Sequence, residues 1–260
     1  MVEIENLTNY IKQKYKVNDR VAKNLAQYML EQYKYLLIPK RDELLIEVYP
    51  HNDIEEYIFH TVLGRKANDA LSRAFAYLIS KEKRTNVRTV VSDYGFSIIV
   101  PKEKALKKVE LLGLLSIKED KFEEILREAI KNSEMFKRVF RHVANTGLMI
   151  LKKYMGKEIP ISRQQINAES LLNFLLEHYP DFPLLKETYR TILEDKMDIF
   201  HAKEFMRKVK KMKIYIKEVE MPSPFAWHLE VWGQSDIIFM QDKKEMIKRL
   251  HKKLLRKIKE

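Results

Sequence analysis

Apolar and polar residues follow two different periods along the 260-residue chain, and the changes of period predict its elements. Residues 1–35 follow a helical period in two segments, and Asn18 is placed to cap the second helix. Residues 44–49 and 57–59 form two apolar runs separated by a turn cluster, which predicts a β-hairpin. The chain therefore opens with two helices and then enters a sheet.

A second unit of pattern runs from Phe59 to Pro101. Gly64 breaks an apolar run, and a helix follows whose apolar residues recur at steps of three and four. Residues 87–92 and 96–100 then read as two strands. Asp93 and Gly95 lie between them, and we expect these two residues to supply the positive φ angles of a tight turn.

Residues 102–155 are mostly helical in pattern. One predicted helix covers 122–132, and the next starts near Ser133 and continues to Tyr154, with Gly156 as its C-cap. A loop is expected at 157–165. The later elements are expected as helices at 168–178, 183–196, 199–210 and 242–259, and as strands at 213–217, 227–232 and 237–240. Strands at both ends and a helical middle predict an α+β fold, with a mostly antiparallel sheet built from both ends of the chain.

Composition adds a strong basic bias. The chain has 49 Lys and Arg against 37 Asp and Glu, a net charge of +12. This excess favours a polyanionic partner such as nucleic acid. A thermophile-like surface rich in Lys and Glu is the alternative, and it explains the 33% of charged residues but not their imbalance. The sequence has no cysteine, no signal peptide and no apolar run long enough to span a membrane, so we expect a cytoplasmic protein.

Nucleotide-binding and metal-binding motifs are missing from the sequence. Its Gly156-Lys157 pair is followed by Glu158, so it does not complete a phosphate-binding P-loop. The seven histidines show no metal-binding spacing, and no serine lies in a hydrolase elbow. We expect no cofactor, no metal and no ATP hydrolysis from this chain alone.

Basic residues on one helix form the first candidate site. Lys137 and Arg141 are four residues apart and share a helix face, with Arg138 beside them. Phe136 and Phe140 would pack the opposite face into the core. A helix of this kind suits contacts to phosphates, and a solvated surface is the alternative interpretation.

Two further basic sites are predicted. Arg65 and Lys66 stand at a helix N-terminus, where the helix dipole disfavours cations unless an anion lies between them or Asp69 pairs with one of them. Arg207 and Lys208 open a second basic run, which could bind nucleic acid or remain solvated.

Separated blocks of the sequence resemble the accessory (DEAD/H-associated) domain at the C-terminal side of Lhr-type, large helicase-related proteins. These blocks are His60, GRKANDALSR at 64–73, SDYGF at 92–96, FKRVFRHVA at 136–144, LEDKMD at 193–198, PSPFA at 222–226 and GQSD at 233–236. The resemblance implies a helical lead-in at 1–38, at the end of a winged-helix and connector region, and the accessory domain at 39–260. It also implies that ATP and Mg²⁺ would bind motor domains supplied in cis or in trans.

Three functions are compatible with these residues. The leading hypothesis is an accessory domain that holds the single-stranded or forked nucleic acid along which an ATP-dependent helicase moves, with Trp227 as a candidate to stack on a base. The second is DNA repair by base excision of the uracil-glycosylase kind, for which Asp236 is the candidate carboxylate. The third is a module that docks motor domains in trans.

Overall fold

The computed structural model of the chain describes residues 2–233, 251–252 and 255. These residues form two compact units. Unit 1 takes its residues from 1–62, 90–105 and 211–260, and unit 2 consists of 63–89 and 106–210. The expected boundary at residue 38 stays a prediction.

Unit 1 begins with the two predicted helices, α1 (Val2–Tyr15) and α2 (Asp19–Tyr35). The Asn18 side chain accepts a 2.9 Å hydrogen bond from the Val21 N–H, which confirms Asn18 as the N-cap of α2. Ile11 on α1 packs against Ala22 and Ala26 on α2. The small alanines let the two helices approach closely.

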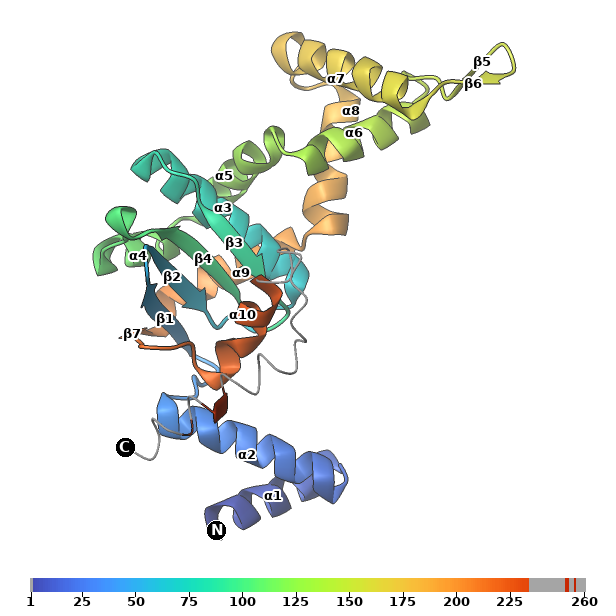
Figure 1. Ribbon diagram of the computed structural model, residues 1–260. Coiled ribbons are helices and arrows are strands. Elements are labelled where there is room, and N and C mark those ends of the chain that lie inside the picture. The colour runs from blue at the N-terminus through green and yellow to red at the C-terminus, as the bar shows by residue number, and fades with distance from the viewer. Residues whose placement is uncertain (1, 234–250, 253–254, 256–260) are drawn as a thin grey trace. The chain divides into compact units, whose positions relative to one another are not determined.

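A mixed five-stranded sheet in the order β3-β4-β2-β1-β7 forms the centre of unit 1 (Figure 1). Its strands are β1 (Glu43–His51), β2 (Ile54–Phe59), β3 (Arg88–Val91), β4 (Phe96–Pro101) and β7 (Lys213–Glu218). β2 pairs antiparallel with both β1 and β4, whereas β7 runs parallel to β1, with Leu44 opposite Ile214. The expected α+β fold, with strands from both ends of the chain, is confirmed.

The turn between β3 and β4 differs from the expectation. Neither Asp93 nor Gly95 has a positive φ. Gly95 is needed for another reason, because a Cβ atom there would collide with the carbonyl oxygen of Phe59. Close approach of two backbones, and not turn geometry, explains this glycine.

A buried polar cluster ties β1 to the last part of unit 1. Glu47 is fully buried and accepts hydrogen bonds from the N–H of Ser223, at 2.8 Å, and from its hydroxyl group. His60 Nε2 lies 2.6 Å from Oε1 of the same carboxyl group. Both Glu47 oxygens therefore have partners inside the fold.

The segment that carries Ser223 is also fixed by helix α2. Tyr35 donates a 2.7 Å hydrogen bond to the Met221 carbonyl, and Tyr28 donates one of 3.0 Å to that of Pro224. A short helix, η4 (Pro224–Ala226), leads into α10 (Trp227–Gly233). The strand expected at 227–232 is thus wrong, since these residues are helical and Leu229 packs against Ile58 of the sheet.

Unit 2 is helical apart from one small hairpin (Figure 1). Its elements are α3 (Arg65–Lys83), α4 (Lys108–Leu115), α5 (Glu119–Lys131), α6 (Glu134–Thr146), β5 (Lys153–Tyr154), β6 (Lys157–Glu158), α7 (Ile161–His178), α8 (Pro183–Arg190), the π-helical turn η2 (Thr191–Lys196), α9 (Ile199–Lys208) and η3 (Val209–Lys211). Helix α3 packs on α5 and α9, and α6 packs on α7 and α8. A further short helix, η1 (Lys102–Lys104), follows β4 in unit 1.

The end of α6 corrects a second expectation. The helix ends at Thr146, where the Gly147 N–H donates a 2.8 Å hydrogen bond to the Val143 carbonyl. Gly156, expected as its C-cap, instead lies in the turn between β5 and β6 with φ of 78°. The expected loop at 157–165 contains β6 and the first turn of α7.

Candidate nucleic-acid interface

Helix α6 carries the basic residues of the first predicted site. Its N-cap is Ser133, whose hydroxyl oxygen accepts a 3.1 Å hydrogen bond from the Phe136 N–H. Phe136 and Phe140 are fully buried. The packed face fixes the rotation of the helix about its axis, so positions 137, 138 and 141 are left for the outer side.

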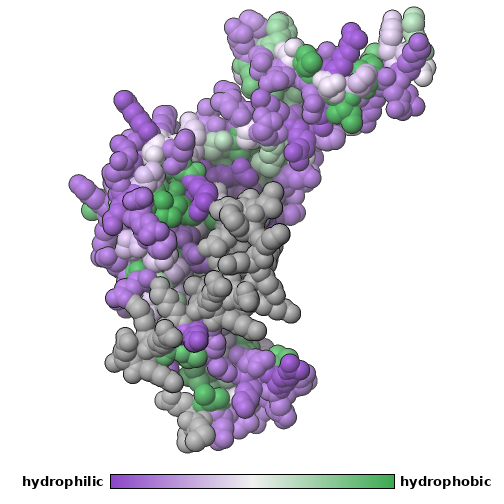
Figure 2. All heavy atoms as spheres, viewed as in Figure 1, coloured by the Kyte–Doolittle hydropathy of each residue, from purple (hydrophilic) through white to green (hydrophobic). Residues whose placement is uncertain are grey.

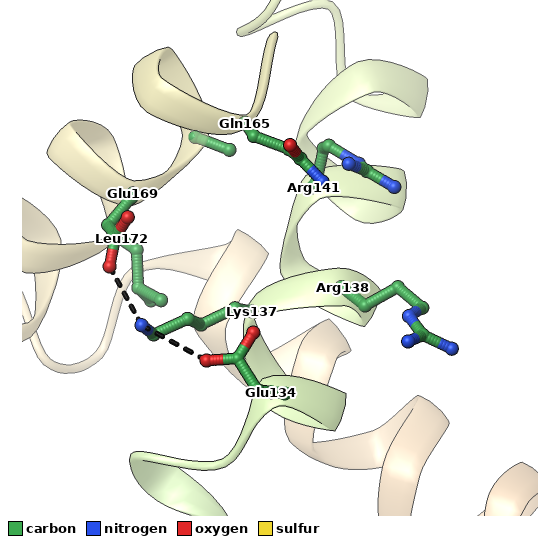
Figure 3. A pocket seen from close by; sticks show the side chains of 8 residues that line it. Glu134, Lys137, Arg138, Arg141, Gln165, Glu169 and Leu172 are labelled. Carbon is green, nitrogen blue, oxygen red and sulfur yellow. Dashed lines mark hydrogen bonds and ion pairs between the residues drawn. The ribbon is translucent and has the colours of Figure 1, made fainter. Parts of the chain in front are cut away.

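Helices α6 and α7 enclose a cleft of about 330 Å³, called the α6–α7 cleft below. Its lining residues are Glu134, Lys137, Arg138 and Arg141 from α6, and Gln165, Ala168, Glu169 and Leu172 from α7. Figure 3 shows Lys137 reaching between two carboxylates, while Arg138 and Arg141 extend to the other side of α6. All three predicted cations of this helix therefore line the cleft, with Lys137 on one side of α6 and the two arginines on the other.

The cations of the α6–α7 cleft differ in their partners. Lys137 Nζ lies 2.8 Å from Glu169 and 3.4 Å from Glu134, and the hydrogen bonds it donates to these two carboxylates raise the pKa of Lys137. Arg138 and Arg141 form no ion pair with any residue that the structure describes. They are three residues apart, so their side chains are neighbours on one face. Two guanidinium groups are therefore available to an anion from outside.

The α7 residues of this cleft were not among the predicted site residues, although a helix was expected at 168–178. Gln165 and Glu169 belong to a helix that begins at Ile161, inside the expected loop. Ala168, Leu172 and Leu175 on the same helix are buried at spacings of four and three residues. That spacing, read together with Pro160 as a helix start, was the signal available.

Arg65 and Lys66 are at the N-terminus of α3, as predicted, and both are exposed. Gly64 precedes them with φ of 84° and provides no side-chain cap. Burial raises the pKa of Asp198, but hydrogen bonds from His201 and the charge of Lys66 lower it overall. Lys66 therefore interacts with the α9 N-cap, and Arg65 also interacts within the protein. The anion expected between these cations stays a prediction.

Arg207 and Lys208 lie in the last turn of α9. Lys208 is 2.6 Å from Glu204, while Arg207 lines a separate cleft of about 310 Å³ among α5, α8 and α9. The predicted cations of unit 2 thus lie on three helices, α3, α6 and α9. The three on α6 line one cleft.

Trp227, the candidate for base stacking, is not on this surface. Trp227 is only 8% exposed, and its Nε1 donates a 3.1 Å hydrogen bond to the Pro222 carbonyl. Trp227 is therefore packed inside unit 1, next to Met221, and does not offer a ring face to a base. Asp236 lies outside the described residues, as do the strand expected at 237–240 and most of the expected last helix.

The face seen in Figure 2 is mainly hydrophilic where residues are described, with smaller apolar groups among them. Within the described part of the chain, no group of His, Asp and Glu side chains is arranged to hold a metal ion. Among the helices that the structure describes, none combines the length and the apolar character that a membrane crossing needs.

The mixed sheet with strands from both ends of the chain, together with the helical middle, defines an α+β fold. The sequence model of the family described as DEAD/H associated matches residues 38–226, so this chain belongs to that family. The family expected from the sequence is confirmed.

Relatives of this chain include two archaeal proteins. The chain is 49% identical over 245 residues to ATP-dependent helicase Lhr-Core protein 2 of Thermococcus barophilus, covering 94% of this chain and 28% of that protein. It is 46% identical to ATP-dependent helicase Lhr-Core of Methanocaldococcus jannaschii, with the same coverage. The chain therefore spans a little over a quarter of the length of these relatives.

A solved structure has the same fold. It is the Mycobacterium smegmatis helicase Lhr bound to ssDNA and AMP-PNP, with a TM-score of 0.72 and 25% sequence identity. The match covers 85% of this chain and 28% of that protein.

Proposed function

We propose that this chain is the accessory domain with which an ATP-dependent helicase of the Lhr type holds the single strand along which it moves. ATP and Mg²⁺ would bind motor domains present in cis or in trans. The observation that carries the proposal is the pair of guanidinium groups of Arg138 and Arg141, which line the α6–α7 cleft, extend to the outer side of α6 and have no ion-pair partner among the described residues.

Charge supports a role of this pair in binding phosphates. Arginine presents a planar fork of donors that matches phosphate oxygens. A net charge of +12 also favours the approach of a polyanion. The two archaeal relatives are named as helicases, and the solved Lhr structure contains single-stranded DNA.

The test compares two double variants that lose the same charge. Arg138→Gln/Arg141→Gln removes the unpaired cations, whereas Lys12→Gln/Lys121→Gln removes two exposed lysines paired with Asp19 and Glu124. Affinity for fluorescent oligothymidylate would be measured by anisotropy over a range of salt concentrations. An oligouridylate series would report the preference between DNA and RNA.

The wild-type affinity should fall steeply with salt, because bound cations are released from the phosphates. Loss of two phosphate contacts should reduce the slope of log affinity against log salt by about 1.4, at roughly 0.7 per contact for a single strand. The lysine variant should keep the wild-type slope. Absence of wild-type binding at low salt, or equal slopes for both variants, would overturn the proposal.

A further inference from the structure

The hairpin between α6 and α7 has an unusual turn. Strands β5 and β6 are joined by Met155 and Gly156 alone, with φ of 48° and 78°. Two consecutive positive φ values define the tight type I′ hairpin turn, whose first position favours Asn, Asp or Gly. Here a methionine occupies that position.

Met155 is unfavourable there on two counts. Its Cβ atom disfavours the left-handed conformation, and it has no polar side-chain atom to bond to the local backbone, as Asn or Asp would. The side chain is also 84% exposed to water. Neither the turn nor the core explains an apolar residue at this tip, and strained residues of this kind are often found at functional sites.

Exposed apolar and basic residues lie close together along the chain around the tip. Tyr154, which pairs with Lys157 across the hairpin, is 60% exposed. Further exposed apolar residues in the same segment are Leu148, Met149 and Leu151. Lys152 and Lys157 are exposed and form no ion pair with the described residues. Rings and apolar side chains among cations are what an unpaired, phosphate-linked base requires.

Hydrogen bonds hold the hairpin at the end of the α6–α7 cleft. The Ile159 N–H donates to the Lys152 carbonyl at 2.8 Å, and the Gln164 amide donates to the Ile159 carbonyl at 2.8 Å. Asn145, near the end of α6, donates to the Gln164 side-chain oxygen at 3.3 Å. The next residue, Gln165, lines the cleft. The hairpin is thus hydrogen-bonded to the two helices that line the α6–α7 cleft, and α6 carries Arg138 and Arg141.

We propose that the β5–β6 hairpin contacts bases, with Tyr154 and Met155 packing against unpaired bases of the strand whose phosphates the α6–α7 cleft binds. This inference rests on the proposed function. The exposed lysines Lys152 and Lys157 beside the tip favour a nucleic acid over a purely apolar partner as the occupant.

The experiment separates base contacts from phosphate contacts. Anisotropy would be measured with oligothymidylate and with an abasic strand of the same length, which keeps the phosphates and lacks the bases. The wild type should bind oligothymidylate more tightly than the abasic strand. Tyr154→Ala should weaken oligothymidylate binding about fivefold or more, which is the lower range for one stacked base, and should leave abasic binding and the salt slope unchanged.

Two further variants distinguish a loss of base contacts from a loss of folding. Met155→Asn places a favoured residue in the turn, so its melting temperature should be unchanged or higher while oligothymidylate affinity falls. Tyr33→Ala removes a 68% exposed tyrosine from α2 and should change neither binding curve. Oligothymidylate binding that is salt-dependent, yet equal for the wild type, Tyr154→Ala and Met155→Asn, would overturn this inference and leave the proposed function standing. If the wild type binds neither strand, both this inference and the proposed function are overturned.

Discussion

Two groups of charged and polar side chains in this protein differ in whether they have partners within the fold. In unit 1, the buried Glu47 carboxyl group has protein partners on both oxygens, from Ser223 and His60. In unit 2, the α6–α7 cleft leaves Arg138 and Arg141 without a partner among the described residues. Buried polar groups must be satisfied within the fold, whereas exposed cations can remain unpaired at little cost. The first group therefore stabilises the protein, and the second is suited to an external anion.

The largest effect is expected from breaking the buried group. Glu47→Ala should lower the free energy of unfolding by about 3–5 kcal/mol, because His60 and Ser223 would be left buried without their acceptor. Urea denaturation measures this change. Glu124→Ala, which removes an exposed carboxylate paired with Lys121, should shift the same quantity by only about 0.5 kcal/mol. Similar small changes in both variants would show that the buried cluster is not a stabilising feature.

A partly buried polar group of unit 1, His228, should make the free energy of unfolding depend on pH. Burial, followed by the charge of His60, lowers the pKa of His228 to about 4. Its ring Nε2 lies 2.6 Å from the Ser92 hydroxyl oxygen, and the Asp93 charge opposes the shift. Between pH 6.5 and 4 the unfolded chain binds a proton that the folded chain does not, so stability falls as the pH is lowered through this window.

Summed over this window, the loss assigned to His228 is on the order of 3 kcal/mol. His228→Gln cannot titrate, so its stability should decline less than that of the wild type between the two pH values. Urea denaturation at a series of pH values gives the difference directly. Parallel pH profiles for the two proteins would show that His228 is not the group responsible.

The smallest expected effect is a gain of binding in the cleft. Glu134→Gln/Glu169→Gln removes the carboxylates that hold Lys137 and should strengthen oligothymidylate binding roughly threefold at low salt, since exposed pairs contribute up to about 1 kcal/mol. Glu124→Gln/Glu187→Gln changes the net charge equally at other ion pairs and serves as the control. Equal gains in both variants would indicate a response to net charge and not to the cleft.

Local patterns predicted most of the sheet and the first helices correctly. Asn18 caps its helix, and four strands within residues 43–101 follow the expected runs. The end of α6 was not predicted, because Leu148, Leu151 and Tyr154 continue its helical spacing although all three are exposed. Periodicity cannot distinguish apolar residues of a core from apolar residues of a surface.

The candidate site was predicted on one wall only. Arg138 and Arg141 could be placed on α6 from their spacing, but the position of α7 beside α6 depends on how the two helices pack. A short apolar run does not distinguish a strand from a buried helix. Trp227 was expected in a strand but lies in a helix. Its ring is held by Pro222 and Met221, contacts that no local pattern reveals.

The parallel pairing of β1 with β7 affects the order in which the chain can fold during translation. Leu44 and its neighbours meet partners such as Ile214 only after the whole helical unit has been synthesised, and Glu47 meets Ser223 later still. A nascent chain that has not reached β7 carries a strand edge and a carboxyl group that await their partners, while local helices such as α1 and α2 can already form. Translation order thus completes the sheet only after all the helices of unit 2 have been synthesised.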